Sequence, residues 1–170
     1  MNARRRVVSV IGGSRESEAG VLRLAEDLGR GIKRAGWHLA CGGMTGVMEA
    51  ACRGFQSVEG PGLAIGILIS GRREDGNPHL DVVLPTGLGL ARNALVVQAG
   101  DAVVAVGGES GTLSEIALAW QYGRPVVGLL PAGGFGAELA GRALDGRRTD
   151  EVRRAGSVEE AMAILEGLLR

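Results

Sequence analysis

The chain has 170 residues, of which 45% are hydrophobic and 22% charged, and its formal net charge is zero. This length and composition suit one globular domain over residues 1–170 with a full hydrophobic core. A neutral chain offers no overall field that would attract nucleic acid or an anionic membrane. No apolar run reaches the roughly 20 residues that a bilayer-spanning helix needs. The expected location is the cytoplasm, since Cys41 and Cys52 alone do not form a disulfide framework.

Strand patterns and helix patterns alternate along the whole chain. In order, they predict strand 6–11, helix 17–35, strand 37–41, helix 45–56, strand 63–69, a polar loop 71–80, strand 81–85, helix 88–99, strand 102–106, helix 111–122, strand 125–130, a short helix near 135–143, and a last helix that Ser157 and Glu160 open as a capping box. Apolar strands separated by helices predict an α/β fold with a three-layer, doubly wound, mainly parallel sheet of the Rossmann-like type. Right-handed crossovers then bring the carboxyl ends of the strands to one edge, where such folds bind ligands.

Two of these helices carry further expectations. Lys33, the only lysine of the chain, falls on the polar side of helix 17–35. A Schiff-base enzyme needs a buried lysine beside its cofactor, so chemistry with pyridoxal phosphate is not expected. Helix 88–99 is apolar almost all round, which predicts burial on both sides, by the sheet and by a second subunit.

Two loops share the pattern strand, Gly-Gly-x-x-Gly, helix. Glycines let the backbone come close to a ligand, and the start of the next helix offers free N–H groups and a partial positive charge. Together these features suit a phosphate or another oxyanion, although tight turns alone would also explain the glycines. A third turn, residues 87–89, is expected to join them. The candidate binding residues are Gly42, Gly43, Thr45 and Gly46 in the first loop, Gly107, Gly108, Ser110, Gly111 and Thr112 in the second, and Gly87 in the third.

Other cofactor motifs are not present in the sequence. The first strand leads into Gly12-Gly13-Ser14 without Gly-x-Gly-x-x-Gly, and the second ends at Cys41 rather than at an acid, which disfavours NAD and FAD. A phosphate loop with Gly-Lys-Ser/Thr is also missing. His38, His79 and the cysteines lack metal-ligand spacing, so no metal site is expected and both cysteines are assigned to the core.

Arg92 lies in the first turn of helix 88–99, among apolar residues. An arginine buried there needs an acidic partner or an anionic ligand. The other interpretation is an arginine that emerges into solvent at the end of the helix.

Glu115 lies near the start of the helix after the second glycine loop and is expected to point away from the inward stripe of Leu113, Ile116 and Trp120. Thr112 and Glu115 have the spacing of a capping box, in which the acid only binds backbone N–H groups. The functional interpretation is a carboxylate beside a phosphate loop, available to bind a hydroxyl or to stabilise a developing cation.

The segment from Gly107 to Glu115, with Arg92 upstream, resembles the LOG family of cytokinin-riboside-monophosphate phosphoribohydrolases. The family signature is Pro-Gly-Gly-x-Gly-Thr-x-x-Glu with an upstream Arg-Lys. Gly108, Gly111, Thr112 and Glu115 match it; Gly107, Glu109 and Asn93 stand where proline, glycine and lysine are expected.

The resemblance is closer to a sister branch, the molybdenum cofactor carrier proteins. It is carried by Gly36-Trp37, by Thr-Gly-Leu-Gly-x-Ala-Arg over residues 86–92, and by Gly-Thr-x-x-Glu-Ile-Ala-Leu-Ala over residues 111–119. The match covers roughly residues 7–130. It implies a Rossmann-like fold and a homodimer or homotetramer. The LOG resemblance adds Gly13 and Ser14, which match the turn after the first strand of that family, to the candidate binding residues.

The resemblance implies two functions. One is a binding or carrier protein for a small phosphorylated ligand, namely the molybdenum cofactor, a pterin phosphate or a nucleotide, with no further cofactor required. The other is an N-glycosidase that cleaves nucleoside 5′-monophosphates, with Arg92 and Glu115 as the catalytic residues. Glu109 adds negative charge within the loop, which weakens phosphate binding unless Arg92 offsets it. A signalling or sensing module with the same fold is a third option.

Overall fold

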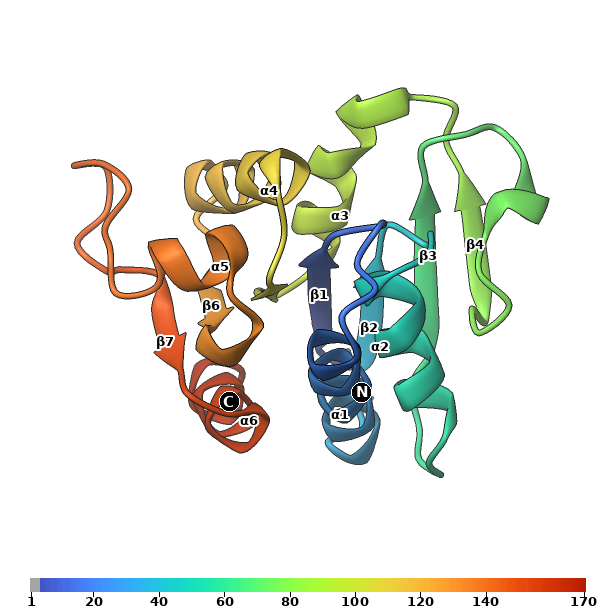
Figure 1. The fold of residues 1–170 in the computed structure, drawn as a ribbon, viewed down its shortest axis with the longest axis horizontal. Helices are drawn as coiled ribbons and strands as arrows, with labels where there is room; N and C mark the ends of the chain where they lie inside the picture. The colour runs from blue at the N-terminus through green and yellow to red at the C-terminus, as the bar shows by residue number, and fades with distance from the viewer. Residues whose placement is uncertain (1–3) are drawn as a thin grey trace.

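Seven parallel strands form one sheet through the centre of the protein (Figure 1), in a computed structural model that describes residues 4–170. Their spatial order is β4-β3-β2-β1-β5-β6-β7, and all six neighbouring pairs are parallel. This confirms the predicted doubly wound α/β fold. The strands are β1 (Val7–Gly12), β2 (His38–Cys41), β3 (Ala64–Leu68), β4 (Val82–Pro85), β5 (Ala102–Val106), β6 (Val126–Leu129) and β7 (Arg153–Ala155).

Helices cover both faces of the sheet and give three layers (Figure 1). Helices α1, α2 and α6 pack on one face, whereas α3, α4 and α5 pack on the other. Burial on both faces of the sheet explains why the sequence of β5 is apolar throughout, because Val104 packs against the first layer of helices and Val103 against the second. The helices are α1 (Ala19–Arg34), α2 (Val47–Gln56), α3 (Asn93–Ala99), α4 (Ser110–Gln121), α5 (Gly134–Leu139) and α6 (Val158–Leu168), with short 3-10 turns η1 (Arg73–Asp75), η2 (Gly89–Arg92) and η3 (Leu130–Ala132). Over residues 4–170 none of these helices is both long and apolar enough to cross a membrane.

The strand order reverses direction at β1. From β1 the chain adds β2, β3 and β4 outward on one side, and β5 then returns to pair with the other side of β1. At the carboxyl ends of these two strands Gly12 lies opposite Val106. The loops that leave β1 and β5 therefore diverge to opposite faces, and the space between them is where doubly wound sheets bind ligands.

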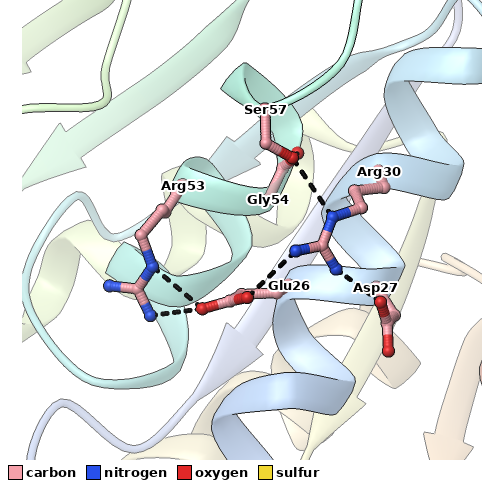
Figure 2. A network of polar contacts seen from close by, with 6 residues as sticks. All are labelled: Glu26, Asp27, Arg30, Arg53, Gly54 and Ser57. Atoms are coloured by element: carbon pink, nitrogen blue, oxygen red, sulfur yellow. Dashed lines mark hydrogen bonds and ion pairs between the residues drawn. The ribbon is translucent and has the colours of Figure 1, made fainter.

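Helices α1 and α2 cross at very short range through two glycines. A Cβ at Gly54 would collide with the carbonyl oxygen of Glu26, and a Cβ at Gly29 would collide with the backbone of α2. Beside this crossing Glu26 accepts hydrogen bonds from Arg53 and Arg30 (Figure 2). The hydrogen bonds from Arg53, with the charge of both arginines, lower the pKa of the Glu26 carboxyl.

Two elements differ from their predictions. Strand β7 was not predicted, because it is a three-residue edge strand with two exposed arginines and no apolar run. The expected helix 88–99 is split into η2 and the seven-residue α3. Gly87 and Gly89 have φ angles of +66° and +56°, a left-handed conformation that does not continue an α-helix.

Lys33 corrects another expectation. It is buried rather than on the polar side of α1: its ammonium donates to the carbonyl of Gly62 at 3.2 Å and lies 4.4 Å from the centre of the Phe55 ring. The first half of the capping box predicted for the last helix is confirmed, because the Ser157 hydroxyl accepts from the N–H of Glu160 at 3.2 Å. The Glu160 carboxylate accepts from the N–H of Gly156, one residue before the N-cap.

Candidate functional site

A cleft of about 730 Å³ opens at the carboxyl edge of the sheet, around the point where β1 and β5 meet. Four strand-to-helix connections form its walls, those after β1, β2, β5 and β6, and η2 contributes part of its floor. Of the residues predicted from the sequence, those that line the cleft are Gly13, Ser14, Gly42, Arg92, Gly108, Ser110, Gly111, Thr112 and Glu115.

Arg92 is a buried cation in this cleft, only 4% exposed, so the interpretation that it emerges into solvent is wrong. Its Nη2 donates to the carbonyl of Gly42 at 3.3 Å and lies 3.6 Å from Met44 Sδ. Its Nη1 is 3.7 Å from Glu115 Oε1, and Nε has no hydrogen-bond partner among residues 4–170. Burial lowers the pKa of the guanidinium, which the negative charge of Glu115 opposes. A guanidinium has five N–H donors, so Arg92 retains unused donor capacity.

Gly42 has a steric reason to be glycine. A Cβ at this position would lie 2.5 Å from both Nη atoms of Arg92. The glycine therefore gives room to the guanidinium, and the first glycine loop and Arg92, fifty residues apart, form one local structure.

Glu115 is also buried, at 7% exposure, on the inner face of α4 together with Thr112, Ile116 and Ala119. The predicted inward stripe was therefore rotated: Leu113 is only partly buried, and Glu115 faces inward toward Arg92. The capping-box interpretation is wrong, because α4 begins earlier, with Glu109 as its N-cap and no side-chain capping bond. Burial raises the pKa of the Glu115 carboxyl to about 7, although the charge of Arg92 opposes this rise.

The start of α4 points its backbone toward the cleft. Ser110, Gly111 and Thr112 occupy the first turn, where N–H groups have no partner within the helix. Gly108 allows the tight entry with a φ of +96°, since a Cβ there would collide with Thr112. Glu109 does not face Arg92: its carboxylate lies 3.7 Å from exposed Arg15, across the mouth of the cleft.

The start of α2 is used differently. The N–H of Val47 donates to the carbonyl of Gly13 at 3.1 Å, and the Thr45 hydroxyl donates to the carbonyl of Ser14 at 2.7 Å. This end of α2 therefore holds the β1 loop in place. From this segment Gly42, Met44 and Met48 line the cleft, whereas Gly43, Thr45 and Gly46 do not.

Two further predicted residues lie outside the cleft lining. Gly107 has a φ of +63° and its carbonyl accepts from the N–H of Gly136, so it joins the β5 loop to α5. The N–H of Gly87 donates to the carbonyl of Ser70, and from the turn that follows it is Leu90 that reaches the cleft.

Sequence reasoning missed the wall after β6. There Ala132, Gly133 and Gly134 line the cleft, and a Cβ at Gly134 would lie 2.6 Å from the carbonyl oxygen of Gly108. A signal was present, because Pro-Ala-Gly-Gly follows a strand and precedes a helix as the other two loops do. The apolar lining residues Met44, Met48, Ile69 and Leu90 and the charged Arg15, Glu16 and Glu18 were also missed.

Comparison with known proteins shows the family to which this chain belongs. The profile of the SLOG cluster4 family matches residues 5–162. A molybdenum cofactor binding protein from Rippkaea orientalis is 34% identical, with a TM-score of 0.84 over 98% of this chain and 99% of that one. The molybdenum cofactor carrier protein of Chlamydomonas reinhardtii is 33% identical, with the same TM-score and coverage.

An uncharacterized protein from Archaeoglobus fulgidus is 37% identical over 124 residues, which are 73% of this chain and 80% of that protein. These matches confirm the relationship that the glycine motifs predicted. The chain belongs to the SLOG cluster4 family.

Proposed function

We propose that this protein binds a small phosphorylated, nucleotide-like molecule in the cleft and acts as a binding or carrier protein. The observation that carries the proposal is Arg92, a buried cation on the cleft floor with an unpartnered Nε and a carboxylate no closer than 3.7 Å. A buried charge left with spare donors is costly, and an anionic ligand would satisfy it.

The lining supports a ligand with two unlike ends. The first turn of α4 and the glycines after β1 and β6 offer backbone groups and close approach, which suit a phosphate. Met44, Met48, Ile69 and Leu90 offer an apolar surface, which suits a flat heterocycle. Arg92 lies between these regions, since it contacts both Met44 and Glu115. The candidate ligands are the molybdenum cofactor, a pterin phosphate and a nucleoside monophosphate; two relatives are described as binding or carrying the molybdenum cofactor.

The second candidate function is hydrolysis of the N-glycosidic bond of nucleoside 5′-monophosphates. Its support is the pair of Arg92 and Glu115 on the cleft floor, with a carboxyl that is ionised in part near neutral pH. An ionised Glu115 would stabilise the oxocarbenium-like transition state while water replaces the base. Gly107, Glu109 and Asn93, which replace residues of the enzyme signature, count against this function.

Calorimetric titration with AMP and with inorganic phosphate, alongside chromatography for free adenine, separates these functions. We expect binding without adenine release, and binding at least about tenfold weaker in Arg92→Gln, because a charge-assisted contact is lost. The matched control is Arg23→Gln, which removes an exposed arginine of α1 and should bind as the wild type does. Circular dichroism checks that both variants fold.

Other outcomes would change the assignment. Adenine release that disappears in Glu115→Gln would establish the hydrolase instead of the carrier. A wild-type protein that binds neither AMP nor inorganic phosphate would leave only a sensing role. A single-stranded oligonucleotide completes the series, and we expect no binding to it, because the chain has no net charge.

A further inference from the structure

Two buried thiols meet directly behind the cleft. Cys41 is the last residue of β2 and Cys52 lies in α2, and both side chains are fully buried. Their sulfur atoms are 3.6 Å apart, and both are free thiols. Most buried cysteines pack singly as small apolar residues. Here two of them touch, and these are the only cysteines of the chain.

The environments of the two sulfurs differ. Cys41 Sγ accepts a hydrogen bond from the N–H of Gly43 at 3.3 Å and another contact from Cys52. The hydrogen bond from Cys52, the Gly43 N–H and the charge of Arg92 lower the pKa of the Cys41 thiol. The contact with Cys41 and burial raise the pKa of the Cys52 thiol. The N–H of Gly43 stabilises negative charge on Cys41 Sγ, so we assign Cys41 as the sulfur that forms the thiolate, which is the reactive species.

A route to Cys41 is short. The next residue in the chain, Gly42, lines the cleft, and so does Met44. A small oxidant that enters the cleft thus comes within one residue of Cys41, whereas Cys52 follows Met48, the α2 residue that lines the cleft, by four residues.

We propose that Cys41 and Cys52 are an intramolecular redox pair that a peroxide closes to a disulfide. The Cys41 thiolate attacks one peroxide oxygen, the O–O bond breaks, and Cys41 becomes a sulfenic acid while hydroxide leaves and takes a proton. Cys52 then attacks the Cys41 sulfur and expels water. In total the two thiols lose two protons and two electrons, and hydrogen peroxide becomes two waters.

The geometry allows the second step with little movement. A disulfide bond is about 2.05 Å long, so the sulfurs at 3.6 Å need to approach by about 1.5 Å. Side-chain rotation with a small shift of α2 can supply this. In a reducing compartment the thiol form is the resting state, and the disulfide forms only under oxidant, as in redox-sensing proteins.

Mass spectrometry of the full-length protein tests the pair. The reduced protein is treated with hydrogen peroxide, quenched with catalase, unfolded and alkylated. We expect a monomeric species that has lost two hydrogens, takes up no alkyl group, yields a peptide linked through Cys41 and Cys52, and returns to two free thiols with dithiothreitol. A wild-type protein that still takes up two alkyl groups, or that links to another chain, would overturn the proposal.

Two single variants test the order of events. In Cys52→Ser we expect Cys41 to accumulate as a sulfenic acid that dimedone traps. In Cys41→Ser we expect Cys52 to be oxidised at least about tenfold more slowly, because Cys52 is fully buried and the Gly43 N–H is donated at the Cys41 position. Equal oxidation rates in the two variants would contradict the assignment of Cys41 as the sulfur that reacts with peroxide. The wild-type experiment stands even if one variant fails to fold.

Discussion

The contact between Gly42 and Arg92 makes one glycine responsible for the position of a charge. In Gly42→Ala the new methyl group would lie 2.5 Å from both Nη atoms and would displace the guanidinium. We expect AMP to bind about tenfold more weakly, because the charge-assisted contact is lost. Calorimetric titration measures the change. The control is Gly167→Ala, where nothing lies within 4 Å of the new Cβ. If Gly42→Ala binds AMP as tightly as the wild type does, Arg92 does not hold the ligand.

Glu115 predicts a pH dependence of stability. Its pKa is raised from the ordinary value of 4.5 to about 7, so between these values the folded protein binds a proton that the unfolded chain has released. Stability therefore falls as pH rises through this window and levels off above it. At about 1.4 kcal/mol per pKa unit, the loss is about 3 kcal/mol.

Urea unfolding of the wild type and of Glu115→Gln, from about pH 4 to about pH 8, measures this effect. The free energy of unfolding of the wild type relative to the variant should decrease across the window. A constant difference would mean that the carboxyl titrates normally, and that Arg92 and the cleft water compensate its burial.

At the scale of residues, the sequence identified Arg92 and Glu115 as candidate site residues but did not predict which residues surround them. Arg92 was singled out because it lies in an apolar helix and Glu115 because it follows a glycine loop, and the structure buries them 3.7 Å apart. Their contact joins segments whose relative rotation periodicity alone cannot give, which is why Glu115 was expected to face away from the core. Lys33 was misplaced for a related reason, because its partners Gly62 and Phe55 come from other elements.

The crossing of α1 and α2 provides a prediction at the scale of elements. In Gly29→Ala the added Cβ would collide with the α2 backbone, whereas in Gly20→Ala its nearest neighbour is a side-chain oxygen at 3.6 Å. Both changes gain up to about 1 kcal/mol of helix propensity. We expect Gly29→Ala to be about 1–3 kcal/mol less stable than Gly20→Ala, through overpacking. Thermal and urea unfolding of the pair measures the difference, and equal stabilities would contradict the close crossing.

The elements themselves were predictable where one local signal dominated. The central strands are apolar runs, and the last helix has a capping box, so both agree with the structure. Strand β7 has no such signal, since it is formed by pairing with β6 at the sheet edge. The break before α3 depended on the φ angles of Gly87 and Gly89, which the apolar pattern of residues 88–99 concealed.

At the scale of the whole molecule, an exposed apolar surface near η2 and α4 bears on the oligomeric state. Leu88 is 54% exposed, and Leu90, 77% exposed, lines a hollow of about 540 Å³ between η2 and α4. Large exposed apolar areas mark interfaces, which supports the expected homodimer or homotetramer. We expect light scattering to report an oligomer for the wild type and a smaller species for Leu88→Arg. The control, Leu63→Arg, changes a 43% exposed leucine at the other end of the sheet and should retain the wild-type mass. A monomeric wild type would refute this inference.

The position of β1 in the middle of the sheet has a consequence for how the protein is made. Val8 of β1 pairs with Leu39 of β2 on one side and with Ala102 of β5 on the other. As the chain leaves the ribosome, the first side is satisfied early, but the second edge of β1 stays open until β5 emerges. Open strand edges promote association with other chains, and such distant pairings form slowly. The nascent N-terminal half therefore exposes an unpaired edge of β1 until β5 has been synthesised.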